Sequence, residues 1–136
     1  MSSISAIAVS GLKATTRRLE VSASNVANQQ STGTLPAANG TVPAGAPQAY
    51  KPLQVVQTAV PGSGTQTSVT TTTPGTIAVS DPQAPFADEN GMVAAPNVDL
   101  AQELIGQMVA KYSYTANLAT LKADRDMTKA LLDATA

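Results

Sequence analysis

The 136-residue chain contains no cysteine, no histidine and no tryptophan, and it has one phenylalanine and three tyrosines. Without cysteine there is no disulfide framework and no thiolate nucleophile. Without histidine, the commonest zinc ligand and the usual general base near neutral pH are both missing. We therefore expect a protein that is not an enzyme, with no catalytic residues, no metal ligands and no cofactor.

Charge and large side chains are also scarce. Eight Lys and Arg residues against nine Asp and Glu give a formal net charge of −1, which is not the charge of a protein that binds nucleic acid. Aromatic residues make up only 3% of the chain, so its core should be thin and its stability should depend on a partner. We expect neither a nucleic-acid partner nor a small-molecule substrate.

Long hydrophobic runs are absent as well. No stretch approaches the roughly 20 apolar residues that a membrane-spanning helix needs, so we expect a protein that is not transmembrane. The mildly apolar amino terminus has no basic region before it, and Lys13, Arg17 and Arg18 follow it instead. We therefore expect no cleavage there by signal peptidase.

Periodic apolar residues predict a long helix at each end of the chain, over residues 2–28 and 98–134. The first segment has apolar residues at spacings near three, four and seven and contains no proline. The second has two adjacent apolar stripes, which require more than one neighbour. The stripes are Leu100, Leu104, Tyr114, Leu118, Leu121 and Leu132, and beside them Ala101, Ile105, Met108, Tyr112 and Ala119.

Residues 29–97 have a different composition, since they hold all nine prolines. Residues 50–60 and 66–80 are rich in β-branched side chains and are joined by PGSG, which predicts a small antiparallel hairpin. Residues 30–48 indicate a loop or a flexible arm. The expected fold is mainly α, with residues 1–28 and 98–136 packed as an antiparallel, coiled-coil-like pair in one domain. A polar, β-rich insertion, 29–97, projects from one end of the pair.

Two asparagines, Asn25 and Asn28, stand one turn apart at the end of the first predicted helix. We interpret Asn25 as a hydrogen-bonding residue that sets the register against a neighbouring helix. Asn28 either shares that task or ends the helix in the left-handed conformation, which asparagine tolerates.

Carboxylates offer an enzymatic alternative, because Asp99 and Glu103 share one face of the second predicted helix. A solvated helix face explains them as well, and Asn97 or Asp99 is the expected cap of that helix. The acidic loop around residues 81–90 does not follow the ligand spacing of an EF-hand, so we do not expect it to bind calcium.

Three motifs resemble those of bacterial flagellar axial proteins, specifically the basal-body rod family. The first is SGLKA at residues 10–14 followed by RLEVSASNVAN at 18–28. The second, DPQAPFADENGMVAAPNVD at 81–99, and the third, SYTAN at 113–117, resemble proximal-rod members most closely.

This resemblance implies a structural subunit of the proximal rod. Such a subunit is exported by the flagellar type III apparatus and assembles with copies of itself and other rod proteins into a drive shaft that crosses the periplasm. Another rod or hook-type subunit, or a secreted binding or adhesion module, remains the alternative. The residues expected to form the helix-packing and assembly interface are Ile4, Ile7, Leu12, Leu19, Asn25, Val26, Asn28, Leu104, Met108, Tyr114, Asn117, Leu118 and Leu121.

Overall fold

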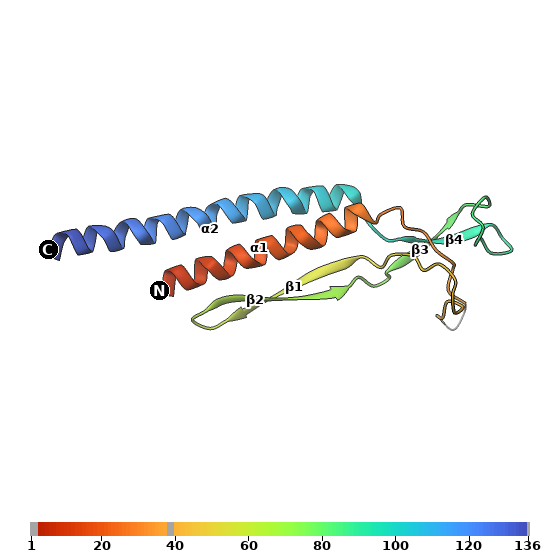
Figure 1. The fold of residues 1–136 in the computed structure, drawn as a ribbon, viewed down its shortest axis with the longest axis horizontal. Coiled ribbons are helices and arrows are strands. Elements are labelled where there is room, and N and C mark those ends of the chain that lie inside the picture. The colour runs from red at the N-terminus through yellow and green to blue at the C-terminus, as the bar shows by residue number, and fades with distance from the viewer. Residues whose placement is uncertain (1–2, 38–39, 136) are drawn as a thin grey trace.

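A computed structural model describes residues 3–37 and 40–135 of the chain and has the predicted architecture. Two long helices run antiparallel, with the amino and carboxyl termini toward the same end (Figure 1). Four short strands lie between them in the sequence. The elements are α1 (Ser3–Ala27), β1 (Leu53–Val60), β2 (Gly64–Thr71), β3 (Thr76–Ser80), β4 (Met92–Pro96) and α2 (Leu100–Thr135).

Local hydrogen bonds are found at the start of α2 and at the end of α1. Asp99 caps α2, since its Oδ1 accepts a hydrogen bond from the backbone N–H of Gln102 at 3.1 Å. The other candidate cap, Asn97, instead donates to the carbonyl of Pro74. At the end of α1, Asn28 Nδ2 donates at 2.9 Å to the Ser24 carbonyl, which also accepts from the Asn28 backbone N–H at 3.1 Å.

The left-handed conformation suggested for Asn28 is wrong, because only glycines have positive φ among the described residues. Asparagine suits this position through its side-chain donor. The backbone there needs no unusual geometry.

The predicted hairpin is present as β1 and β2, paired from Leu53↔Thr71 to Val60↔Gly64. The predicted second strand, 66–80, is in fact two strands, because the chain bends between β2 and β3 around Pro74, which has no N–H to donate. β3 pairs with β4, a strand that was not predicted, and Gly33 adds a bridge to Ala94 on β4. That bridge ties the base of the 30–48 loop to the second sheet.

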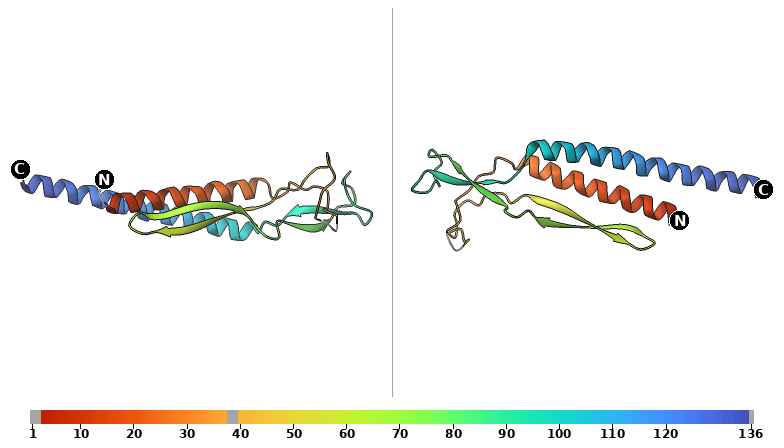
Figure 2. Two further views of the ribbon diagram at one scale, coloured as in Figure 1. Left: turned by 90° about the horizontal axis from the view of Figure 1, so that it is seen from below. Right: turned by 180° about the vertical axis from the view of Figure 1, so that it is seen from behind.

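The expectation that the whole insertion projects from one end is only partly right. The β1–β2 hairpin folds back along α1, so that α1 lies between the hairpin and α2 (Figures 1 and 2). Hydrogen bonds to α1 hold it there, among them those from Arg18 Nη2 to Gln57 Oε1 at 2.8 Å and from the N–H of Thr65 to Ser10 Oγ at 3.1 Å. β3, β4 and residues 30–37 and 40–48 do project beyond the helices.

Small and polar side chains, not large apolar ones, fill the space that α1 shares with its neighbours. Ser5, Ala8, Thr15 and Ser22 are buried on α1, and Ser5 Oγ donates to the buried carboxylate of Asp124 on α2. Short side chains allow two helices to approach closely, because the distance between helix axes follows the size of the side chains at the contact. The helix pair therefore buries little large apolar surface of its own.

One close contact between the helices joins two of the sequence motifs. A Cβ atom on Gly11, from the SGLKA motif, would overlap the carboxamide of Asn117, from SYTAN. Asn117 cannot turn away freely, since its Nδ2 donates to the carbonyl of Ser113 at 2.8 Å. Any larger residue at position 11 would therefore have to displace the side chain of Asn117.

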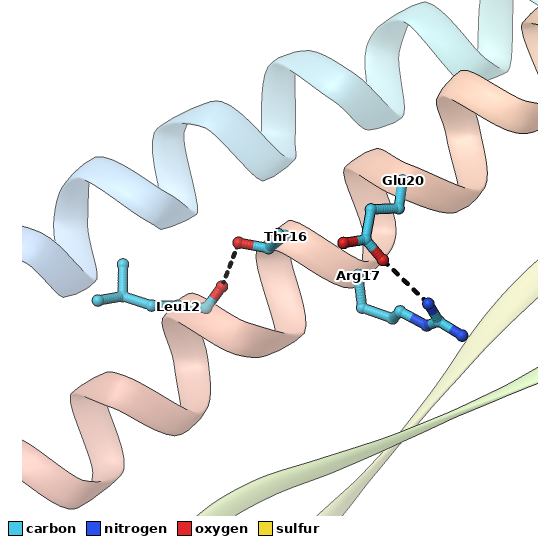
Figure 3. A network of polar contacts seen from close by, with 4 residues as sticks. All are labelled: Leu12, Thr16, Arg17 and Glu20. Atoms are coloured by element: carbon cyan, nitrogen blue, oxygen red, sulfur yellow. Dashed lines mark hydrogen bonds and ion pairs between the residues drawn. The ribbon is translucent and has the colours of Figure 1, made fainter.

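Part of the exposed surface of α1, around Thr16, Arg17 and Glu20, is polar (Figure 3). Arg17 Nη1 and Glu20 Oε2 lie 2.9 Å apart in an exposed ion pair, and Thr16 Oγ1 donates to the Leu12 carbonyl at 3.0 Å. An exposed pair of this kind contributes little to stability.

We predict that Gly11→Ala destabilises the subunit by on the order of 1 kcal/mol, although alanine is the better helix former, because the new methyl displaces Asn117. Gly106→Ala is the matched control on α2, where a Cβ would meet nothing within 4 Å. That change should stabilise by about 0.5–1 kcal/mol. Chemical denaturation followed by circular dichroism measures both.

The same steric mechanism predicts that a second substitution, at Asn117, removes the loss of stability caused by Gly11→Ala. In an Asn117→Ala background, Gly11→Ala should lose its penalty because the displaced carboxamide is gone. If Gly11→Ala stabilises the unmodified subunit as much as Gly106→Ala does, the close contact between residues 11 and 117 is not formed in solution.

Candidate assembly interface

The side chain of Asn25 is almost fully buried and uses its whole hydrogen-bonding capacity. Its Nδ2 donates to the Leu53 carbonyl at 2.8 Å and to Glu103 Oε1 at 2.6 Å. Its Oδ1 accepts from the Leu53 N–H at 2.9 Å and from the Tyr50 hydroxyl at 3.0 Å. One carboxamide on α1 therefore binds both the start of β1 and the first turn of α2.

The contact with Leu53 has the form of strand pairing, because the carboxamide offers one donor and one acceptor to the N–H and C=O of a single residue. Leu53 faces Thr71 of β2 on its other side. The Asn25 side chain thus takes the place of a neighbouring strand at the edge of the hairpin.

Further hydrogen bonds surround Asn25, and we call the whole group the Asn25 cluster. Gln107 Nε2 of α2 donates to Ser22 Oγ at 3.1 Å, and Ser24 Oγ lies 3.0 Å from the Tyr50 hydroxyl. The cluster joins α1, α2 and the residues that lead into β1. Its members are Ser22, Ser24, Asn25, Tyr50, Leu53, Glu103 and Gln107.

The predicted hydrogen bond from Asn25 to a neighbouring helix is present, and its partner is Glu103 of α2. The sequence did not identify the contacts with Leu53 and Tyr50, because no local pattern shows that a hairpin folds back onto a helix 25 or more residues away. Asp99 and Glu103, the pair considered for acid–base chemistry, are both engaged structurally: Asp99 caps α2 and Glu103 binds Asn25.

Most of the large apolar residues assigned to the interface remain on the surface of this chain. Asn25 is the one that is buried, while Leu12, Val26, Asn28, Asn117 and Leu121 are partly covered. More than 40% of each of the others is exposed: Ile4, Ile7, Leu19, Leu104, Met108, Tyr114 and Leu118. The contact between α1 and α2 is therefore made without most of these residues, and they stay available to another molecule.

A strongly exposed apolar group lies on α2, on the side away from α1. Ile105, Met108 and Tyr112 are 62%, 58% and 69% exposed. The helix positions that point toward α1 are occupied by the buried Ala110 and Asp124. A chain that leaves such residues exposed along a long helix has the surface expected of a subunit that packs against others.

The acidic loop before β4 has a structural explanation. Asp88 Oδ1 accepts hydrogen bonds from the backbone N–H groups of Asn90 and Met92, both at 2.8 Å. Within residues 3–37 and 40–135, no group of three Asp, Glu, His or Cys side chains is placed to hold a metal ion.

Neither α1 nor α2 suits a bilayer. Over the residues that the structure describes, no helix combines the length and the hydrophobicity needed to span a membrane.

Family models of flagellar basal-body rod proteins match both ends of the chain. Residues 6–33 match the family described as flagella basal body rod protein, and residues 89–134 match the family described as flagellar basal body rod FlgEFG protein C-terminal. These segments contain the Asn25 end of α1 and nearly all of α2.

Curated relatives match over most of the chain. The flagellar basal-body rod protein FlgC of Salmonella typhimurium is 37% identical over 125 residues, which cover 89% of this chain and 87% of the relative. FlgC of Agrobacterium fabrum is 33% identical over 138 residues, covering 98% and 94%. FlgC of Yersinia enterocolitica is 34% identical over 128 residues, covering 89% and 87%. With two terminal helices, a β-rich insertion and this similarity along nearly its whole length, the chain belongs to the FlgC family of flagellar basal-body rod proteins.

Proposed function

We propose that the chain is a building block of the proximal rod of the flagellar basal body. It polymerises with copies of itself and with other rod proteins into the shaft that crosses the periplasm and transmits torque to the hook and filament. It reaches that place through the flagellar type III export apparatus. The role is structural, and it requires no catalytic group, cofactor, nucleic acid or small-molecule substrate.

The observation that carries this proposal is the exposed apolar surface of α2. A single chain covers only one side of that helix, with α1, and leaves residues such as Ile105, Met108 and Tyr112 in solvent. Burying such side chains contributes roughly 25 cal/mol for each Å² of apolar surface removed from water. Association with further subunits is the process that would bury them.

Transmission of torque also requires that each subunit resist twisting. The Asn25 cluster supports this role, since its hydrogen bonds connect α1, α2 and the hairpin at one end of the helix pair. At the other end, Ser5 of α1 donates to Asp124 of α2. The two helices are thus connected near both ends of α1.

We predict that Leu118→Asp blocks incorporation into the rod, because it places a charge in an apolar contact between subunits without a partner. The subunit itself should still fold, since Leu118 is 49% exposed in the isolated chain. Thr120→Asp is the control, an exposed polar position on the same helix. Immunoblots of purified basal bodies and swimming assays measure the outcome. Normal rods containing Leu118→Asp would contradict the proposal.

A second prediction concerns the proposed role of Asn25 in holding the register between α1 and α2. Asn25→Asp removes both donors and sets a carboxylate beside Glu103, so the free energy of unfolding should fall by on the order of 1–3 kcal/mol. Glu103→Gln keeps an acceptor and should be much milder. Combined with Asn25→Asp, Glu103→Gln should restore part of the lost free energy of unfolding, because glutamine can donate to the new carboxylate.

Asn28→Ala serves as the local control, since the side chain of Asn28 bonds only within its own helix end. It should leave the register intact and assembly normal. If Asn28→Ala impairs assembly as strongly as Asn25→Asp, then register does not depend on the Asn25 cluster.

A further inference from the structure

An asparagine–glycine pair, Asn90–Gly91, lies in the turn that leads into β4. Asparagine followed by glycine is the sequence that deamidates most readily, because glycine has no side chain to shield the peptide nitrogen that attacks the asparagine. The side chain of Asn90 is exposed, so water reaches it. The turn takes no part in the Asn25 cluster or in the contact between α1 and α2, so its chemistry is independent of the proposed function.

The shape of the turn requires glycine at position 91. Gly91 has a φ of 71°, in the left-handed region that residues with a side chain rarely adopt. A Cβ atom there would also lie 3.0 Å from Cγ of Pro82, closer than an ordinary contact. The glycine that makes Asn90 labile therefore cannot be replaced without straining the turn.

Asp88 closes the turn with both its backbone and its side chain. Its carbonyl accepts a hydrogen bond from the Gly91 N–H at 2.9 Å, and its own N–H donates to the Met92 carbonyl at 2.9 Å. Its Oδ1 accepts from the N–H groups of Asn90 and Met92, both at 2.8 Å. The Gly91 carbonyl in turn accepts from the Asp81 N–H at 2.9 Å. The peptide nitrogen that would attack Asn90 is thus engaged, and the backbone on both sides of it is fixed.

We propose that Asn90 is a site of deamidation and that Asp88 keeps the reaction slow in the folded chain. In this reaction the Gly91 nitrogen gives its proton to hydroxide and forms a bond to Cγ of Asn90. The bond from Cγ to the side-chain nitrogen breaks, and that nitrogen takes a proton from water and leaves as ammonia. Water then hydrolyses the cyclic succinimide to aspartate or isoaspartate. The attack requires the Gly91 nitrogen to leave the Asp88 carbonyl, so it proceeds when the turn opens.

Either product changes this end of the molecule. Aspartate adds a negative charge beside Asp88 and Glu89, and isoaspartate also inserts a methylene group into the backbone. Met92, which follows the altered peptide bond closely, forms the last pair of the second sheet with Ser80. By slowing deamidation, Asp88 preserves the start of β4.

Peptide mapping by mass spectrometry tests the proposal on the purified full-length chain, incubated at mildly alkaline pH. The exchange of the side-chain NH2 for OH identifies the product. In the unmodified chain, Asn90 should react on the order of tenfold more slowly under native conditions than in urea, because the hydrogen bonds of the turn must first break. Asp88→Ala should raise the native rate at Asn90 by on the order of tenfold and leave the rate in urea unchanged.

Two variants and an internal reference serve as controls. Asp88→Asn should keep most of the protection, since a carboxamide oxygen still accepts hydrogen bonds from the backbone. Glu89→Ala removes a neighbouring carboxylate that accepts neither of the Asp88 side-chain bonds, and it should leave the native rate unchanged. The second asparagine–glycine pair of the sequence, Asn39–Gly40, is followed in every sample, and its rate should not respond to Asp88→Ala.

Three results would overturn the proposal. The first is a native rate at Asn90 that Asp88→Ala does not change. The second is an equal rise at Asn39, which would show that the substitution unfolds the chain generally. The third is a rate at Asn90 that is the same under native conditions and in urea, or undetectable in both.

Discussion

The structure depends most on one carboxamide. Asn25 is buried between α1, α2 and the start of the hairpin, and its four hydrogen bonds reach all of them. A buried polar group of this kind tolerates no slippage, because shifting either helix by one turn would leave several donors and acceptors unmatched at a cost of about 1–3 kcal/mol each. In a chain with so few large buried side chains, polar matching determines register where a hydrophobic core would otherwise do so.

The second constraint is the small size of the side chains between the helices. Ser5, Ala8, Gly11 and Thr15 let α1 approach α2 closely, and this arrangement leaves the larger apolar residues on outer faces. The residues that pack α1 against α2 thus differ from those that we propose for assembly. The exposed surface around Arg17 and Glu20 is polar, whereas the exposed face of α2 around Ile105, Met108 and Tyr112 is apolar.

The sequence predicted the two helices, the hairpin and the bond from Asn25 to α2, because each of these has a local signal: apolar periodicity, the PGSG turn, and an amide side chain one turn before the end of a helix. It missed β4, whose short alanine-rich strand pairs only through contacts set by the loop that precedes it. It also missed Tyr50 and Leu53 as partners of Asn25, since folding the hairpin back onto α1 is a tertiary event. Periodicity identified the apolar stripes of α2 but could not show that α1 leaves most of both exposed, because the buried positions of α2, Ala110 and Asp124, are small or polar and belong to neither stripe.

The central claim is that the free subunit is held together at the Asn25 cluster while the apolar face of α2 awaits other subunits. Amide hydrogen exchange, compared between the free subunit and purified rods, tests it most directly. The account predicts that in the free subunit the slowest exchange lies in α1 and α2 near Asn25 and Glu103. Residues 125–135, which extend past the start of α1 (Figure 1), should exchange fastest and gain the most protection on assembly. Uniform protection of α2 in the free subunit, unchanged in the rod, would contradict it.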